Sequence, residues 1–197
     1  MMNDLKAIAV FCGSSEGNDT KIISEAKALG KTLAKEQITL VYGAAKIGIM
    51  GNIAQSSLDH HGKVIGVIPE FLKMKEVVHL GLSELITTEN MHERKLKMHE
   101  ISDGFITLPG GFGTFEELFE IITWAQLGLH QKPIGLLNIN GFYDDLISML
   151  ETMVSKGFLK LDNLELLIVD NNIDRLLDKM RNFKPQDVPK WLKADRT

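Results

Sequence analysis

The nine residues 109–117, PGGFGTFEE, form the segment of the chain that is best suited to bind an anion. They lie between an apolar run, residues 104–108, and apolar side chains at helical spacing that include Phe115, Leu118 and Phe119. The order is therefore strand, glycine turn and helix start. Because glycine lacks a Cβ atom, backbone N–H groups in the turn can approach a ligand closely, and the helix N-terminus adds unpaired donors and a partial positive charge. The segment predicts an anion site, with phosphate as the best candidate.

Thr114 has two competing roles in this segment. Its hydroxyl can bind the anion, or it can cap the helix together with Glu117, which stands three residues further on as in a capping box. An ordinary capped connection between a strand and a helix is thus the structural alternative to a binding site.

A pair of basic residues, Arg94 and Lys95, occurs in a second helical pattern just after a predicted strand. On its own, such a pair is typical of a solvated helix face. If the start of this helix opens on the same crevice as the glycine turn, Arg94 can form paired hydrogen bonds with phosphate or sugar oxygens, and Lys95 adds a positive charge.

Apolar runs of strand length alternate with helical patterns along the chain, which predicts an α/β fold: a Rossmann-like open parallel sheet with helices on both faces. Strands are expected at residues 7–11, 38–42, 64–68, 105–108, 134–137 and 166–169. Helices are expected at residues 20–35, 50–61, 91–101, 114–127, 143–156 and 173–182. Residues 70–88 are less regular and are expected to form a loop with a short strand at 85–87, as a candidate wall of the site.

Small polar loops follow several of these strands. In an open parallel sheet the ligand crevice lies at the carboxyl ends of the strands, so residues 12–17, residues 43–51 and the glycine turn are expected to meet there. Gly13, Ser14 and Gly43 are therefore candidate binding residues.

The composition bounds the class of protein. With 197 residues, 44% of them hydrophobic, the chain is expected to form one domain, 1–197, in which residues 184–197 are a flexible tail or dock on a neighbouring element. A net charge of −4 argues against a nucleic-acid partner, and no apolar run reaches membrane-spanning length. One cysteine and the lack of a signal-peptide pattern favour a cytoplasmic location.

Several other chemistries are disfavoured. The histidines are scattered without a metal-ligand spacing, so no metal is predicted and each is expected to be a surface or capping residue: His60, His61, His79, His92, His99 and His130. Cys12 follows a buried strand without an evident histidine partner and is expected to be a core residue. The dinucleotide fingerprint G-x-G-x-x-G is absent after the first strand, and its acidic partner is absent after the second. No cofactor is predicted.

Taken together, the motifs resemble the Lonely Guy (LOG) family, cytokinin riboside 5′-monophosphate phosphoribohydrolases that are often mislabelled as lysine decarboxylases. The resemblance covers most of the chain, from about residue 7 to residue 159. It is carried by VFCGSSEGN, VYGAAKIGIMG, GKVIGVIPEFL, MHERK, PGGFGTFEE and ITWAQLGLHQKPIGLLN. The combination of MHERK and PGGxGTxxE, with 23 residues from Arg94 to Glu117, is the most specific part.

The resemblance implies a homodimer that hydrolyses the N-glycosidic bond of a nucleoside 5′-monophosphate, AMP or an N6-modified AMP, to free base and ribose 5-phosphate. It implies that Arg94 and Glu117 are the catalytic pair. It further implies a nucleotide-binding set of Glu76, Lys95, Gly110, Gly111, Phe112, Gly113, Thr114, Glu116 and Thr123. Apolar residues around Trp124, Leu127 and Leu129 are expected to supply the surface for a second copy.

Two points qualify the resemblance. The family usually has a run of glycines where this chain has Gly43, Ala44 and Ala45, which places two additional methyl groups near the ligand and introduces strain wherever an alanine adopts positive φ. Similar Rossmann-like proteins are also non-catalytic carriers of molybdenum cofactor, so a nucleotide or cofactor carrier is the alternative function. Lysine decarboxylation is disfavoured because no Schiff-base lysine with a partner for the pyridoxal ring can be identified.

Overall fold

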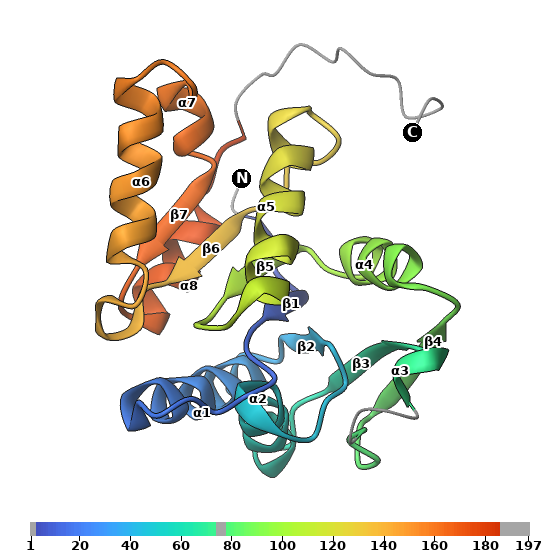
Figure 1. Cartoon of the computed structure of the whole chain (residues 1–197). Coiled ribbons are helices and arrows are strands. Elements are labelled where there is room, and N and C mark those ends of the chain that lie inside the picture. The colour runs from blue at the N-terminus through green and yellow to red at the C-terminus, as the bar shows by residue number, and fades with distance from the viewer. Residues whose placement is uncertain (1–2, 74–77, 186–197) are drawn as a thin grey trace.

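The computed structural model of the protein describes residues 3–73 and 78–185, which form a seven-stranded parallel sheet with helices on both faces (Figure 1). This confirms the predicted α/β class. The strand order is β4-β3-β2-β1-β5-β6-β7, and all neighbouring pairs are parallel. The strands are β1 (Ala7–Phe11), β2 (Thr39–Tyr42), β3 (Val64–Pro69), β4 (Glu84–Thr88), β5 (Gly104–Thr107), β6 (Ile134–Leu137) and β7 (Leu167–Asp170).

Two apolar cores lie on opposite faces of the sheet because strand side chains alternate. In β1, Ile8 and Val10 enter one core, and Ala9 and Phe11 enter the other. The first core is covered by α1 (Thr20–Lys35), α2 (Gly48–Asp59) and α8 (Ile173–Arg181). The second is covered by α4 (Met91–Glu100), α5 (Phe112–Gln126) and α6 (Asp144–Ser155).

Strand β1 is the point at which the strand order reverses, with β2 on one side and β5 on the other. The loops after β1 and β5 consequently lie against each other, and the N–H of Gly13 donates to the carbonyl of Pro109 at 3.1 Å. A Cβ atom at Gly110 would lie 2.8 Å from the nitrogen of Gly13, so this contact requires glycine at position 110. The fold therefore brings together two of the predicted loops, as expected at a switch point.

The predicted and observed elements differ mainly in segments with weak periodicity. The short strand expected within residues 70–88 is present as β4, but the same segment also contains the short helix α3 (Glu70–Lys73). The short helix α7 (Leu161–Leu164) and the single 3₁₀ turn η1 (Ile139–Gly141) were not predicted. These one-turn elements are too short to produce a recognisable helical repeat.

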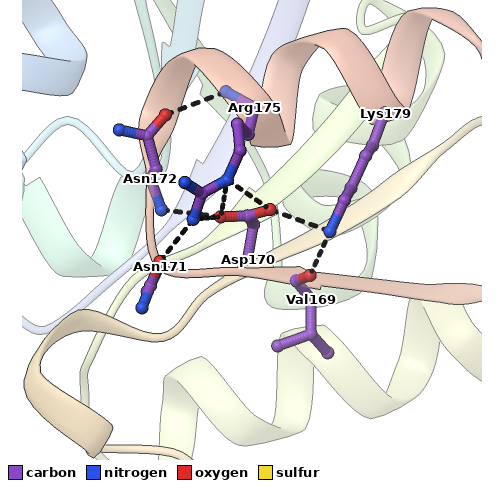
Figure 2. A network of polar contacts seen from close by, with 6 residues as sticks. All are labelled: Val169, Asp170, Asn171, Asn172, Arg175 and Lys179. Carbon is purple, nitrogen blue, oxygen red and sulfur yellow. Dashed lines mark hydrogen bonds and ion pairs between the residues drawn. The ribbon is translucent and has the colours of Figure 1, made fainter.

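The carboxyl end of the edge strand β7 carries a polar network that fixes the start of α8 (Figure 2). The buried carboxylate of Asp170 accepts from the N–H of Asn172 at 2.9 Å, from Nη2 of Arg175 at 2.8 Å and from Nζ of Lys179 at 2.8 Å. Asn172 caps the helix by accepting from the N–H of Arg175 at 3.0 Å. Burial by itself would raise the pKa of Asp170, but these donors outweigh it and hold the pKa well below its ordinary value.

Two of the histidine predictions are wrong. His79 and His130 are buried, and both rings are hydrogen-bonded inside the protein. His130 stacks at an angle against Phe105 and His99 beneath α5. Burial depended on which loops fold back onto the sheet, and local sequence does not encode that. Among the helices of the described ranges, none is both long enough and apolar enough to span a membrane.

Candidate functional site

A cavity of about 260 Å³ opens at the carboxyl ends of the central strands, where α2, α4 and α5 begin. Most of the predicted site residues line it: Gly13, Ser14, Gly43, Arg94, Gly111, Phe112, Gly113, Thr114 and Glu117. Val10, Cys12, Met50 and Met98 also line it and were not predicted to do so. Their apolar character is a signal for core packing, and only the fold reveals that this part of the core forms the cavity wall.

The predicted residues outside this lining are placed as follows. Gly110 lines a neighbouring cavity that shares Gly13, Ser14 and Gly111 with the first one. Lys95, Glu116 and Thr123 do not line the cavity. Glu76 lies outside the described residues, as do residues 186–197 of the predicted tail.

The helix after the glycine turn begins two residues earlier than predicted. Gly111 is the N-cap of α5, and no side chain caps the helix there. Thr114 therefore lies inside the first turn, which rules out the capping box of Thr114 and Glu117 that the sequence offered as the alternative to a binding site. The first N–H groups of a helix have no intrahelical partner, so Phe112, Gly113 and Thr114, which line the cavity, offer backbone donors there.

The N-terminus of α2 is different, although it borders the same cavity. The N–H of Ile49 donates to the carbonyl of Ser15 at 3.4 Å, and the N–H of Met50 donates to that of Gly13 at 3.2 Å. Gly48 makes this contact possible, because it has φ 69° and a Cβ atom there would lie 2.2 Å from Ser14. The start of α2 is thus used to hold the loop after β1, which leaves α5 as the helix end for an anion.

Arg94 and Glu117 form a buried ion pair across the cavity wall. Nη1 of Arg94 in α4 donates to Oε1 of Glu117 in α5 at 2.9 Å, and Nε donates to the carbonyl of Val67 in β3 at 3.1 Å. The residues are only 8% and 9% exposed, respectively. Nη2 lies against Gly43, where an added Cβ atom would be 2.3 Å away. Two edges of the guanidinium are therefore fixed by protein, and Nη2 is the group that adjoins the cavity.

Burial raises the pKa of Glu117, and the nearby positive charge of Arg94 only partly opposes this effect. A carboxylate with a raised pKa is a stronger base than a free glutamate side chain, which suits it to accept a proton from water. Cys12 lines the same cavity, but burial raises the pKa of its thiol. Its place in the apolar core confirms the prediction that it is a core residue.

Lys95 links the two helices that carry the ion pair. Its Nζ donates to Glu116 at 2.5 Å and to Glu120 at 2.9 Å, both in α5. Partial burial would lower the pKa of Lys95, but these two carboxylates outweigh it and raise the pKa. In this arrangement the positive charge of Lys95 is neutralised by two carboxylates and holds α4 against α5 beside the cavity.

The alanines that replace the family's glycines are both buried, and neither is part of the cavity lining. Ala44 has φ 66°, so the expected strain is present at this position. Its methyl group packs against β3, within 2.8 Å of the position that a Cβ atom at Gly66 would occupy. The two methyl groups expected near the ligand are thus not part of the lining of this cavity.

Comparisons with known proteins show the family to which the chain is related. A family model described as "Possible lysine decarboxylase" matches residues 50–180. A cytokinin riboside 5′-monophosphate phosphoribohydrolase of Arabidopsis thaliana, LOG2, is 42% identical over 92% of this chain and 85% of its own length. A protein of Rhodococcoides fascians that is also named cytokinin riboside 5′-monophosphate phosphoribohydrolase is 43% identical over 90% of each chain.

Solved structures show the same fold at lower sequence identity. The molybdenum cofactor binding protein from Rippkaea orientalis superposes with a TM-score of 0.68 at 22% identity, covering 91% of this chain and 97% of that one. A molybdenum cofactor carrier protein from Chlamydomonas reinhardtii gives 0.65 at 16% identity, covering 91% and 98%. At these identities the likeness supports the fold alone, whereas the relatives above are more than 40% identical over nine-tenths of the chain. The chain therefore belongs to the Lonely Guy family of cytokinin riboside 5′-monophosphate phosphoribohydrolases.

Proposed function

We propose that this protein hydrolyses the N-glycosidic bond of a nucleoside 5′-monophosphate, AMP or an N6-modified AMP, to free base and ribose 5-phosphate. The observation that carries this proposal is the buried pair of Arg94 and Glu117 in the cavity that also receives the uncapped N-terminus of α5. One end of the cavity thus suits a phosphate group, and a carboxylate lies in the same space. Relatives named as phosphoribohydrolases support the same reaction.

The phosphate is assigned to the start of α5. The N–H groups of Phe112, Gly113 and Thr114, together with the positive end of the helix dipole, form a site for a dianion without any metal. The Thr114 hydroxyl lies against the glycine turn, 2.1 Å from the position that a Cβ atom of Gly110 would take. It is a further donor for a phosphate oxygen.

Glu117 is assigned to the reacting carbon. As the bond from C1′ to the base breaks, its electron pair leaves with the base and positive charge develops on the ribose ring, as in glycoside hydrolysis. The carboxylate stabilises this charge and accepts a proton from the water that attacks C1′. The base takes a proton from solvent and Glu117 returns its proton to solvent, which balances the reaction. Arg94 orients Glu117 and offers Nη2 to a substrate oxygen.

The decisive experiment incubates purified protein with a panel of nucleoside monophosphates and measures free base and ribose 5-phosphate. Release of base in many turnovers supports hydrolysis. A nucleotide or molybdenum cofactor carrier would bind ligand without turnover, so stoichiometric binding with no product would contradict the proposal. N6-prenylated AMP in the same panel distinguishes a preference for cytokinin precursors from a preference for AMP.

The functional unit is proposed to be a homodimer formed through α5. This helix presents an exposed apolar stripe of Phe112, Phe119 and Leu127, and Phe112 is 95% exposed. Trp124 and Leu129, which the sequence suggested for this surface, are partly buried, and Trp124 contacts His99 of its own subunit. The stripe rather than Trp124 is the surface that a second copy would cover.

Thr123 is assigned to the same surface of α5. It is exposed on the same side of α5, about 13 Å along the helix from Thr114, and its hydroxyl donates to the carbonyl of Phe119 at 2.7 Å. If Thr123 contacts a nucleotide, that nucleotide lies in the site of the second copy.

We also propose a cytoplasmic location, which fits a phosphorylated substrate and the single buried cysteine. Cell fractionation tests this location.

A further inference from the structure

A strained alanine lies next to the catalytic arginine. Gly43 follows β2 and touches Nη2 of Arg94 so closely that a Cβ atom would be 2.3 Å away. The next residue, Ala44, is fully buried and has φ 66°, a conformation that L-residues with a Cβ atom rarely adopt. Because this backbone is not favoured by the residue itself, it must be held by its surroundings.

The surroundings that hold it belong to the loop before β4. The N–H of His79 donates to the carbonyl of Ala44 at 2.9 Å, and Ala45 forms an isolated antiparallel bridge with Val78. The loop is thereby attached to the two residues that follow Gly43.

His79 is itself fixed at both ring nitrogens. Nδ1 accepts from the N–H of Gly81 at 3.2 Å, so the proton is on Nε2, which donates to Oε1 of Gln55 in α2 at 3.1 Å. The residue is 5% exposed, and burial together with the charge of Lys46 lowers its pKa, which keeps the ring neutral. The ring thus connects α2 to the loop that carries His79, and the backbone N–H of His79 connects this loop to Ala44.

We propose that His79 is a positioning residue for Arg94: by holding Ala44 in its left-handed conformation, it fixes Gly43 against Nη2. The hydrogen bonds of Nε to Val67 and of Nη1 to Glu117 fix the plane of the guanidinium, and Gly43 is the backbone that lies against Nη2, so a displaced Gly43 would change the space that Nη2 shares with a substrate oxygen. The contacts run from Gln55 through His79 and Ala44 to Gly43. This inference rests on the proposed nucleotide hydrolysis, in which Arg94 touches substrate.

The test uses His79→Asn, which keeps an acceptor for the N–H of Gly81 but cannot reach Gln55. We expect kcat/KM for AMP to fall at least about tenfold, the effect of losing one well-placed hydrogen bond on a positioned group. Glycine adopts positive φ freely, so Ala44→Gly makes the restraint dispensable. The double variant with Ala44→Gly should recover kcat/KM to within about threefold of the unsubstituted protein.

A matched control separates positioning from general stability. Gln37 also has positive φ, 58°, but lies after α1 and does not line the cavity. Gln37→Gly relieves the same kind of strain and should raise the melting temperature of His79→Asn without restoring kcat/KM. Equal rescue by Gln37→Gly, no rescue by Ala44→Gly, or normal kcat/KM in His79→Asn would each overturn the proposal.

A second readout does not depend on turnover. Hydrogen exchange of residues 43–46 should accelerate in His79→Asn and slow again when Ala44→Gly is added, whereas exchange in α8 should be unchanged. If the unsubstituted protein releases no base from any nucleotide, the proposed function fails, and this exchange pattern still decides whether His79 holds the loop. Unchanged exchange at residues 43–46 in His79→Asn would overturn the inference by itself.

Discussion

Nη1 of Arg94 in α4 and Oε1 of Glu117 in α5 are 2.9 Å apart in a nearly solvent-free wall of the cavity. The two side chains come from helices that pack on the same face of the sheet, and Lys95 joins the same helices through Glu116 and Glu120. The buried ion pair is thus supported by a second set of charges, in which Lys95 follows Arg94 in α4 and the more exposed Glu116 and Glu120 lie one residue before and three residues after Glu117 in α5. A buried pair of this kind leaves an uncompensated charge when one member is removed.

Glu117→Gln tests the role of this carboxylate. It removes the negative charge and keeps the size of the side chain, so turnover of AMP should fall at least about a hundredfold, the lower end for a positioned acid–base group. AMP affinity should change much less, since phosphate is assigned to the backbone of α5. Turnover, calorimetric binding and melting temperature are measured on one preparation. Glu120→Gln, one turn further on, is the matched control, and near-normal turnover in folded Glu117→Gln would remove Glu117 from the catalytic assignment.

The pH dependence of turnover follows from the raised pKa of Glu117. A general base must be ionised, so kcat is lost as pH falls through the raised pKa, which lies above the ordinary value of about 4.3. The phosphate of AMP has its second pKa at about 6, so free AMP also changes charge in this range. Measuring kcat at saturating AMP reports the titration of the bound complex instead. The residual turnover of Glu117→Gln should lack this acid limb. An identical limb in both proteins would assign the titration to another group.

The phosphate site predicts a preference for AMP over adenosine. Binding energy from the phosphate can hold the ribose in a reactive geometry, so adenosine should be a much poorer substrate. Thr114→Val keeps the shape of the buried side chain and removes its hydroxyl. Loss of a hydrogen bond to a charged group should lower kcat/KM for AMP by about 10- to 100-fold and leave that for adenosine unchanged. Equal turnover of AMP and adenosine by the unsubstituted protein would refute the phosphate site.

The α5 stripe predicts a dimer that a single charge disrupts. Light scattering of the unsubstituted protein should give twice the chain mass of 22.0 kDa at micromolar concentration. Phe119→Arg places a charge in the stripe and should give the mass of one chain. Phe158→Arg, at another exposed aromatic residue between α6 and α7, should leave the dimer intact. A single-chain mass for the unsubstituted protein would exclude a stable dimer.

Asp170 predicts an acid-dependent loss of stability. The pKa of Asp170 is depressed in the folded protein, so the unfolded chain binds more protons than the folded protein as pH falls. The contribution of this carboxylate to the free energy of unfolding is fully present above the unfolded pKa of about 3.9, and it is lost as pH falls toward the lower pKa of the folded state. Asp170→Asn should lower the free energy of unfolding by about 1–3 kcal/mol at pH 7. Denaturant titrations should show this difference shrinking toward pH 3. Asp174→Asn, at an exposed aspartate in the first turn of α8, should change stability less, and a difference independent of pH would contradict the charge argument.

The sequence by itself determined the fold class, because strand and helix periods are local patterns. It also determined that a glycine turn precedes a helix after β5, since the glycines of residues 110–113 and the following apolar spacing are contiguous. The resemblance placed Arg94 and Glu117 in the site, and the cavity contains both.

Only the tertiary structure decided how these residues are used. The sequence allowed Thr114 and Glu117 to cap the helix. In the structure the helix starts at Phe112, and Glu117 pairs with Arg94, 23 residues away in the chain. The burial of His79 and the left-handed backbone of Ala44 likewise depend on a loop that returns to the sheet from more than 30 residues further on. Such contacts arise when distant segments pack together, and their geometry is not encoded in the neighbouring residues.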